Sequence, residues 1–513
     1  MRAVVVGGGH NGLVAACSLA RAGCEVTVLE QAGKPGGGSR TDETVPGYRF
    51  DTHSAAHNII NMTSIPAELR LAEAGLVYQE MEPFAAGFFA DGAVVRFHRS
   101  IEATVASIAE HDPAEARRYA DLMDRALPLV AVAVAGLAGG SSLPSLLRTA
   151  GGRLGSLAKA VRRFGGPAGL VHDLIAPYGA LLETHLGSEL TRAPVSAFAA
   201  HSSAGPHVPG GSFYALWQAA YHRFGQWHAR GGSQALIDAL TIRLSSYGGV
   251  IRTGARVTRI EAPNGRVRAV VLADGQRLPA DHVITAIDPG VALLELCDPP
   301  LSGPAAAELR AVHRGNAVQM VVHVATTALP AYRGARAGDW NGLQSHVDTV
   351  AELTRGFRAA EARVLPDPAP TYAFTPSALD PGLALAGRHT VYLACPCAPY
   401  DVDGGWDAHG ERFAEAMIDS MEAHAPGFRD TIVGVAIRTP ALMAQELLWP
   451  GAHPMVSDIS LDQLAFLRPT RRLASHRTPI EGLVISGGGT APTGGIAGVP
   501  GKAAAAVVLC RRL

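Results

Sequence analysis

Charge is scarce in this 513-residue chain: only 17% of its residues are Asp, Glu, Lys or Arg, and lysine occurs at just three positions. The 44 basic and 45 acidic side chains give a formal net charge of −1. Nucleic-acid binding needs a concentrated basic surface, so we expect no nucleic-acid partner. Hydrophobic residues make up 48% of the chain, which argues against disorder and, at this length, predicts two or three domains. The abundance of Ala, Gly, Arg and Pro, whose codons are rich in G and C, leads us to expect a bacterial source.

Cysteine is also rare, with six residues and no C-x-x-C pair, which argues against a disulfide scaffold. No H-E-x-x-H motif or Cys/His ligand spacing occurs, so we expect no metal. The longest apolar run, Leu127 to Leu137, is shorter than the ~20 residues that a membrane-spanning helix needs. A strand begins at Ala3 and leaves no room for a signal peptide, so we expect a cytoplasmic protein. The sequence has no G-x-S-x-G or P-loop motif to support hydrolysis or phosphoryl transfer.

The first 30 residues carry the strongest local signal. The β-branched run at residues 3–6 predicts a buried parallel strand, residues 13–21 a helix, and residues 25–30 a second strand that ends in an acid. Between the first strand and the helix, glycines at G-x-G-x-x-G spacing permit a tight turn, the approach of a pyrophosphate and close helix–strand packing. The acid can accept hydrogen bonds from ribose hydroxyls and would repel a 2′-phosphate, which disfavours NADP. We expect a dinucleotide to contact Gly7, Gly9, His10, Asn11, Gly12, Glu30 and Gln31.

A second glycine segment, residues 36–41, begins six residues after the acid. It combines glycine flexibility with an arginine and two hydroxyl groups, which suits the second phosphate of a dinucleotide. We expect cofactor contacts at Gly37, Gly38, Ser39, Arg40 and Thr41.

Residues 47–54 extend this pattern, and here the sequence resembles the phytoene-dehydrogenase-like flavoproteins, within the wider amine-oxidase and glutathione-reductase type of FAD fold. In that family a Gly-Gly doublet and an Arg-Thr pair follow the ribose-binding acid, and a Phe-Asp-x-Gly loop then runs beside the flavin. The chain matches Phe50 and Asp51 but has His53 where glycine is usual. The resemblance implies that the dinucleotide is FAD. It covers most of the chain, is weakest between about residues 84 and 206, and is strongest to the branch named pyridine nucleotide-disulfide oxidoreductase domain-containing protein 2.

Two later blocks continue the resemblance. The middle block predicts a helix from residue 231, a strand at 250–253, a β-hairpin over 257–271 and a buried strand near 281–288. The C-terminal block is a strand at 482–486 that enters a glycine-rich loop and an alanine-rich helix at 502–509. The loop reads Ala-Pro-Thr-Gly-Gly where the family has His-Pro-Gly-Gly-Gly, so no role for that histidine is carried over. The resemblance implies further cofactor contacts at Val257, Gly488, Gly489, Gly495, Ile496 and Ala497.

The order of these elements predicts an α/β protein with a Rossmann-like FAD domain of the glutathione-reductase and amine-oxidase type, together with an α+β substrate domain. The FAD domain is expected to be discontinuous, from residues 1–75, 226–300 and 471–513. The substrate domain is expected to contain residues 76–225 and 301–470.

Four aromatic residues are candidates for the substrate wall. Tyr214, Trp217 and Tyr221 are spaced i, i+3 and i+7 and so share one helix face, and Trp227 precedes the return to the FAD domain. An aromatic stripe is as often ordinary core, and only its place next to the flavin segments favours a substrate wall.

Histidine supplies the candidates for a catalytic base. His53 and His57 lie closest in sequence to the expected flavin loop, and either can serve as a general base. Taken singly, each histidine is more often structural.

Residues 143–166 form a basic and roughly amphipathic segment with five Lys or Arg side chains and no acid. Such a segment can rest on anionic lipid and admit an apolar substrate. The alternative is a solvated helix that covers the substrate domain. We expect at most peripheral membrane contact here.

The sequence therefore predicts an FAD-dependent dehydrogenase that desaturates a largely apolar organic substrate by hydride transfer to flavin N5, as a tailoring step in isoprenoid or specialised-metabolite biosynthesis. Oxygen or a quinone would reoxidise the flavin. A flavin amine oxidase that forms C=N bonds is the close alternative. A non-catalytic lipid-binding protein on the same fold is the second.

Overall fold

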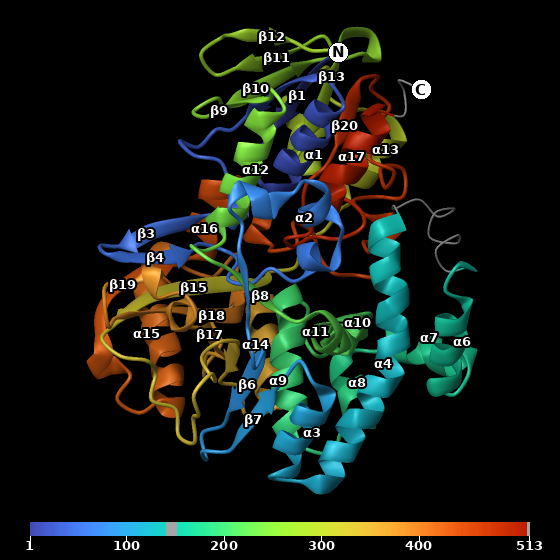
Figure 1. Ribbon diagram of the computed structural model, residues 1–513. Helices are drawn as coiled ribbons and strands as arrows, with labels where there is room; N and C mark the ends of the chain where they lie inside the picture. The colour runs from blue at the N-terminus through green and yellow to red at the C-terminus, as the bar shows by residue number, and fades with distance from the viewer. Residues whose placement is uncertain (140–150, 510–513) are drawn as a thin grey trace.

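The computed structural model describes residues 1–139 and 151–509 of the chain. Its upper part in Figure 1 contains a five-stranded sheet in the order β20-β13-β1-β2-β9, in which every pair of neighbours is parallel. Three separated stretches of sequence therefore build one sheet, and the predicted α/β fold is confirmed. The strands are β1 (Arg2–Val6), β2 (Glu25–Leu29), β9 (Val250–Arg252), β13 (His282–Thr285) and β20 (Leu483–Ile485).

Three helices cover this sheet: α1 (His10–Arg21), α12 (Gln234–Ser246) and α17 (Val499–Leu509). Helix α1 lies against both of the others. Helix α17 begins three residues earlier than predicted, because Pro500 fits the first turn of a helix, where an N–H is not needed.

A four-stranded sheet in the order β12-β11-β10-β14 lies beside the parallel sheet (Figure 1). The predicted hairpin is confirmed as the antiparallel pair of β10 and β11, with Asn264 at a left-handed φ of 54° in the turn. The strands are β10 (Val257–Glu261), β11 (Ala269–Leu272), β12 (Arg277–Pro279) and β14 (Cys297–Asp298).

A seven-stranded sheet in the order β19-β15-β18-β17-β16-β6-β7 forms the second body of structure. Successive side chains of a strand point to opposite faces of the sheet. Both faces of this sheet are buried. Tyr372, Phe374 and Tyr392 pack on one face and Ala373 and Leu393 on the other. The strands are β6 (Ala85–Phe88), β7 (Val94–Phe97), β15 (Ala317–Thr326), β16 (Leu343–Ser345), β17 (Tyr372–Phe374), β18 (His389–Pro399) and β19 (Ile432–Arg438).

Helices shield both faces of this sheet (Figure 1). The tyrosine-bearing face packs mainly against α3 (Ile101–Ala109), α4 (Pro113–Gly139), α8 (Tyr178–His185), α9 (Glu189–Ala199), α10 (Ser212–Leu216) and α11 (Gln218–Phe224). The other face packs against α14 (Val350–Glu361) and α15 (Trp406–His424). Helices α6 (Leu154–Arg163) and α7 (Pro167–Ile175) lie outside α4. Three further α-helices in the described ranges are α2 (Ile65–Glu68), α13 (Gly303–Arg310) and α16 (Pro440–Leu447).

A hairpin of β3 (Thr41–Val45) and β4 (Tyr48–Asp51) continues from the second glycine segment and contacts the seven-stranded sheet. Phe50 stacks on His323 of β15 with ring centroids 4.6 Å apart. A second pair, β5 (Tyr78–Glu80) with β8 (Trp227–Ala229), returns the chain to the parallel sheet. The exact division into two domains stays a prediction.

Candidate flavin site

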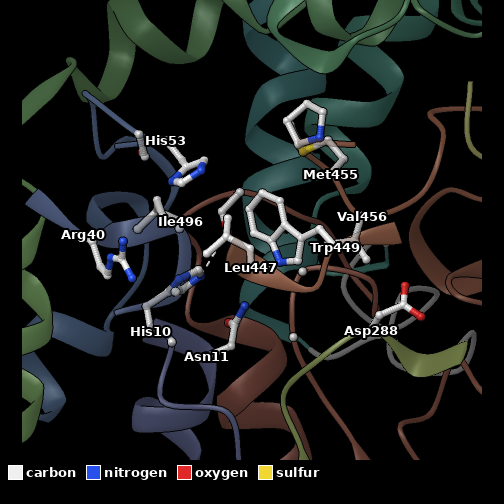
Figure 2. A pocket seen from close by; sticks show the side chains of 18 of the residues that line it. His10, Asn11, Arg40, His53, Asp288, Leu447, Trp449, Met455, Val456 and Ile496 are labelled. Atoms are coloured by element: carbon white, nitrogen blue, oxygen red, sulfur yellow. Dashed lines mark hydrogen bonds between the residues drawn. The ribbon is translucent and has the colours of Figure 1, made fainter. Parts of the chain in front are cut away.

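One cavity of about 870 Å³ is lined by both the parallel sheet and the seven-stranded sheet. Its lining includes the ends of β1, β2 and β13, where the loops of a parallel α/β sheet usually bind ligands. Figure 2 shows His10, Asn11 and Arg40 in this cavity together with Trp449, Met455 and Asp288. Residues far apart in sequence therefore face one space.

The first glycine loop, residues 7–12, has the geometry of a phosphate cradle. Gly7 has a φ of 103°, which side-chain-bearing residues rarely adopt. A Cβ on Gly12 would lie 2.0 Å from Gly7 O, so this position also requires glycine. Gly9 is different, because the nearest atom to an added Cβ is Gly36 O at 3.8 Å. The backbone at Gly9 is thus open to a ligand at the N-terminus of α1.

Glu30 directly follows β2, one residue beyond the end of the strand and not inside it as predicted, and the backbone orients its carboxylate. Its carboxylate accepts hydrogen bonds from the N–H groups of Gly8 and Ala32, each at 2.8 Å. The residue is 8% exposed and lines the cavity next to Val257. An ionised carboxylate has about four acceptor positions, so it retains capacity for ribose hydroxyls. The donor set fits the ribose of a dinucleotide.

His10 joins the three glycine segments. Its Nε2 lies 3.1 Å from Gly495 O, and its Nδ1 lies 3.3 Å from Ser39 Oγ. Since a carbonyl oxygen only accepts, Nε2 carries the hydrogen and Nδ1 accepts from the Ser39 hydroxyl. Burial lowers the pKa of His10 to about 4, so the ring is neutral near pH 7. Sequence analysis assigned no role to this side chain beyond cofactor contact.

The structure places most of the expected cofactor residues on the cavity. Those that line it are Gly7, Gly9, His10, Asn11, Glu30, Gln31, Gly37, Gly38, Arg40, Val257, Gly488, Gly495 and Ile496. Five others stand behind the lining: Gly12, Ser39, Thr41, Gly489 and Ala497. Thr41 shows what such a residue does there, since its hydroxyl donates to Asp51 at 2.6 Å and accepts from the backbone N–H of Gln234 at 3.0 Å.

His53 lines the cavity with one free ring nitrogen. Its Nδ1 lies 2.8 Å from the hydroxyl of Thr52, which in turn donates to Arg40 O at 3.2 Å. Nδ1 is therefore the donor, and Nε2 is a bare acceptor that is buried without a partner among the described residues. Burial, followed by the positive charges of Arg438 and Arg40, holds the pKa of His53 well below its ordinary value.

His57 and Trp227 lie away from the cavity lining. The two ring nitrogens of His57 are 3.0 Å from the Tyr78 hydroxyl and 2.9 Å from Ser233 Oγ, and the residue is 1% exposed. Both nitrogens are occupied, so His57 has a structural role and not that of a base. Trp227 donates its indole N–H to Phe224 O at 2.8 Å and, as the first residue of β8, is paired with Glu80 of β5.

An aromatic wall forms the other side of the lining. Tyr214 of α10, Tyr221 of α11 and Trp217 between the two helices are on it, although the single helix that their spacing predicted is interrupted at Trp217. Sequence analysis missed the residues that the seven-stranded sheet and α9 contribute, because the periodicity of a short strand does not reveal its partners. These are Phe198, His201, Tyr372, Phe374 and Tyr392.

A second missed element is residues 448–456, which follow α16 and which we call the strap. Its Trp449 lies near the centre of the view in Figure 2. A Cβ added to Gly38 would lie 2.9 Å from the Trp449 ring, so the indole packs on the second glycine segment. Leu448, Ala452 and Val456 have φ values of 49°, 48° and 69°, which are unfavourable for these residue types. The packed cavity wall holds this backbone in place.

Within residues 1–139 and 151–509, no cluster of His, Cys, Asp and Glu has the arrangement of a metal site. In the same ranges, no helix combines the length and the apolar character that crossing a bilayer requires.

Comparisons with known proteins agree with this geometry. The family described as flavin containing amine oxidoreductase matches residues 12–379. The chain is 30% identical over 548 aligned positions to pyridine nucleotide-disulfide oxidoreductase domain-containing protein 2 of Rattus norvegicus, covering 99% of this chain and 93% of that protein. It is 27% identical to a lycopene-forming phytoene desaturase of a Paracoccus species, covering 98% and 96%. A solved structure of putrescine oxidase, 16% identical, superposes with a TM-score of 0.64 over 100% of this chain and 99% of that one, which shows the shared fold.

The chain therefore belongs to the family of flavin-containing amine oxidoreductases. It is an FAD-dependent oxidoreductase, and the resemblance inferred from the sequence is confirmed. The cradle at Gly9, the oriented Glu30 carboxylate and the loop bound by His10 are consistent with that cofactor.

Proposed function

We propose that this enzyme dehydrogenates a largely apolar organic substrate and forms a C=C bond. The observation that carries the proposal is that the glycine loops and the aromatic wall line the same cavity. A cofactor held by the loops and an apolar guest held by the aromatic rings would then meet in one water-poor space. When bound, FAD supplies a hydride acceptor.

Residues of the chain itself bind the cofactor, position the substrate and accept the second proton. Glu30 and the first glycine loop bind the dinucleotide, and His10 holds the C-terminal loop against them. The aromatic wall positions the substrate and excludes water. His53 lines the cavity, its Nε2 is unprotonated and has no partner among the described residues, and it is our candidate for the group that accepts the second proton.

Amine oxidation stays the alternative, because aromatic faces also attract ammonium groups. Three of the four carboxylates on the lining, all except Glu295, speak against it. Glu30 faces backbone N–H groups, Asp288 is paired with Arg314, and Glu446 is paired with Arg438. The aromatic wall itself consists of neutral side chains and therefore supplies no negative charge to balance a protonated amine. The family assignment as an oxidoreductase removes the non-catalytic lipid-binding alternative.

Anaerobic bleaching of the flavin tests the proposal. The FAD-loaded protein is mixed with hydrocarbon polyenes, apolar alcohols and primary amines, and the loss of visible flavin absorbance is followed. Bleaching by the neutral apolar compounds, with a new C=C bond in the product, supports dehydrogenation. Bleaching by amines alone would establish the alternative.

We also propose that oxygen or a quinone reoxidises the flavin, that the enzyme works in the cytoplasm and that it touches membranes only peripherally. Of the segment 143–166, residues 143–150 lie outside the described residues. In the rest, Leu154 is 64% exposed, but Lys159 and Arg163 pair with Asp124 at 3.8 and 2.6 Å, which favours the solvated-helix alternative. Flotation with vesicles of anionic lipid tests membrane contact, and full recovery in the unbound fraction would remove it.

A further inference from the structure

His201 lies on the aromatic side of the cavity, in the 3-10 turn Ala200–Ser202 that follows α9, and its ring is 4.1 Å from that of Tyr372 and 5.9 Å from that of Phe198. We propose that His201 determines substrate specificity: its Nε2 accepts a hydrogen bond from a neutral hydroxyl or N–H group on an otherwise apolar substrate. This inference rests on the proposed function and narrows its substrate class.

The hydrogen bonds of His201 fix its tautomer. Nδ1 lies 3.0 Å from Phe198 O and 3.1 Å from Ala197 O, which are carbonyl groups in the last turn of α9. Carbonyl oxygens only accept, so Nδ1 carries the hydrogen. A neutral imidazole has one N–H, and Nε2 is therefore a bare acceptor on the opposite edge of the ring. Burial lowers the pKa of His201 to about 4, which keeps the ring neutral near pH 7.

This acceptor has no partner in the described part of the chain, although it is buried. A buried polar atom without a hydrogen bond is costly, and native structures rarely leave one unpaired. Of the rings in contact with His201, that of Tyr372 carries a hydroxyl donor, but this hydroxyl makes no hydrogen bond to Nε2. A donor on the substrate is the group that would relieve the cost, and it would do so only for molecules that carry one in the right place.

Two amide side chains on the same cavity repeat the pattern. Gln226 is 1% exposed, and its Oε1 is buried without a partner among the described residues. Asn58 also lines the cavity, and its Oδ1 is likewise unpaired. The backbone bond of 2.8 Å from His57 N to Trp227 O holds these two residues in neighbouring segments. Three side chains that line the cavity, from separate segments, thus carry buried acceptors without partners among the described residues, and this combination suits a neutral donor better than a plain hydrocarbon.

The test uses indole and indene, which share one bicyclic shape but differ in an N–H and a CH₂ group. Each is titrated into the FAD-loaded full-length protein, and the change in the flavin's visible spectrum gives the dissociation constant. We expect indole to bind about five- to tenfold more tightly than indene, which is the usual worth of one added hydrogen bond. In His201→Phe the two constants should become equal, because the acceptor is lost while the ring is kept.

His201→Gln is the rescue variant, since its amide oxygen reaches a position similar to that of Nε2 and should keep part of the preference. His172→Phe is the matched control, because the His172 side chain is 76% exposed and should not alter either constant. Thermal unfolding of each variant shows whether it folds, and the rescue variant keeps the test valid if His201→Phe does not.

Equal binding of the two probes to the parent, no spectral change with either, or a preference that survives in His201→Phe would overturn the inference. The readout needs no turnover, so it separates the two proposals. A parent that prefers indole but is bleached by no neutral compound would refute the dehydrogenase proposal and leave the role of His201 intact. A parent that is bleached by neutral compounds but binds indole and indene equally would refute the role of His201 and leave the dehydrogenase proposal intact.

Discussion

His10 and Gly495 lie 485 positions apart in sequence, yet His10 Nε2 donates a hydrogen bond of 3.1 Å to the carbonyl of Gly495. This bond ties the first glycine loop to the C-terminal loop, so the two halves of the cofactor cradle form a single unit. His10→Ala should therefore weaken FAD binding by about tenfold, from the loss of one buried hydrogen bond and of the packing around it. Fluorescence titration of the apoprotein with FAD measures the effect, and unchanged affinity would show that the loops do not depend on this bond.

Two glycines of the same loop should respond differently to substitution. Gly12→Ala places a Cβ 2.0 Å from Gly7 O, and backbone cannot yield cheaply, so we expect a large drop in the unfolding temperature of the apoprotein. Gly9→Ala has its nearest contact at 3.8 Å, so the apoprotein should unfold near the parent temperature while FAD binding is lost. Equal unfolding temperatures for the two variants would contradict the geometry described above.

Glu30→Gln tests the ribose contact. The amide keeps the size of the side chain but removes the charge and turns one acceptor oxygen into a donor that faces Gly8 N–H or Ala32 N–H. We expect at least about a tenfold loss of FAD affinity. Glu43→Gln is the surface control, because Glu43 is exposed and its carboxylate accepts a hydrogen bond from the turn at Gly47. An affinity equal to the parent's would show that Glu30 does not hold the cofactor.

Much of the cofactor site follows from the sequence, because its motifs are local. Gly7, Gly9 and Glu30 sit within one βαβ unit, and short-range turn chemistry fixes where they lie. The substrate side does not follow in this way. Tyr372 and Phe374 alternate with Ala373 in β17, but only the pairing with β18 shows which face of the sheet they share. Trp449 has no sequence signature at all, since strained backbone in the strap places it.

His57 shows the limit in the other direction. Its closeness in sequence to the expected flavin loop suggested a catalytic base. Two hydrogen bonds and near-complete burial instead make it a structural residue. A lone histidine gives no sequence signal that separates these roles. His53 was chosen on the same grounds, and only its free Nε2 on the cavity distinguishes it.

Gly38 and Trp449 should be energetically coupled. Gly38→Ala would place a Cβ 2.9 Å from the indole ring and push the strap outward. In a Trp449→Ala background the same change has room, so a double-mutant cycle on apoprotein stability should give a coupling of about 1 kcal/mol. A coupling near zero would mean that the indole does not rest on the second glycine segment.

Acid should destabilise the apoprotein through its buried neutral histidines. Burial lowers the pKa of His201 from 6.5 to about 4. Between these two pH values the unfolded chain is protonated at His201 and the folded chain is not. The free energy of unfolding is therefore unaffected by protonation of His201 above pH 6.5 and decreases as the pH falls from 6.5 toward about 4. His201→Gln should reduce the slope of unfolding free energy against pH in this window by up to about 1.4 kcal/mol per pH unit. Identical slopes for parent and variant would show that His201 is not buried in neutral form.

The most direct test of the central claim compares the rate of anaerobic flavin bleaching in the parent and in His53→Gly, which restores the residue usual in the family. The account predicts that neutral apolar compounds bleach the parent, and that His53→Gly keeps its FAD but reduces that rate by about 100-fold, as expected for loss of a general base. A parent that stays fully coloured with every neutral compound and is bleached only by amines would contradict it.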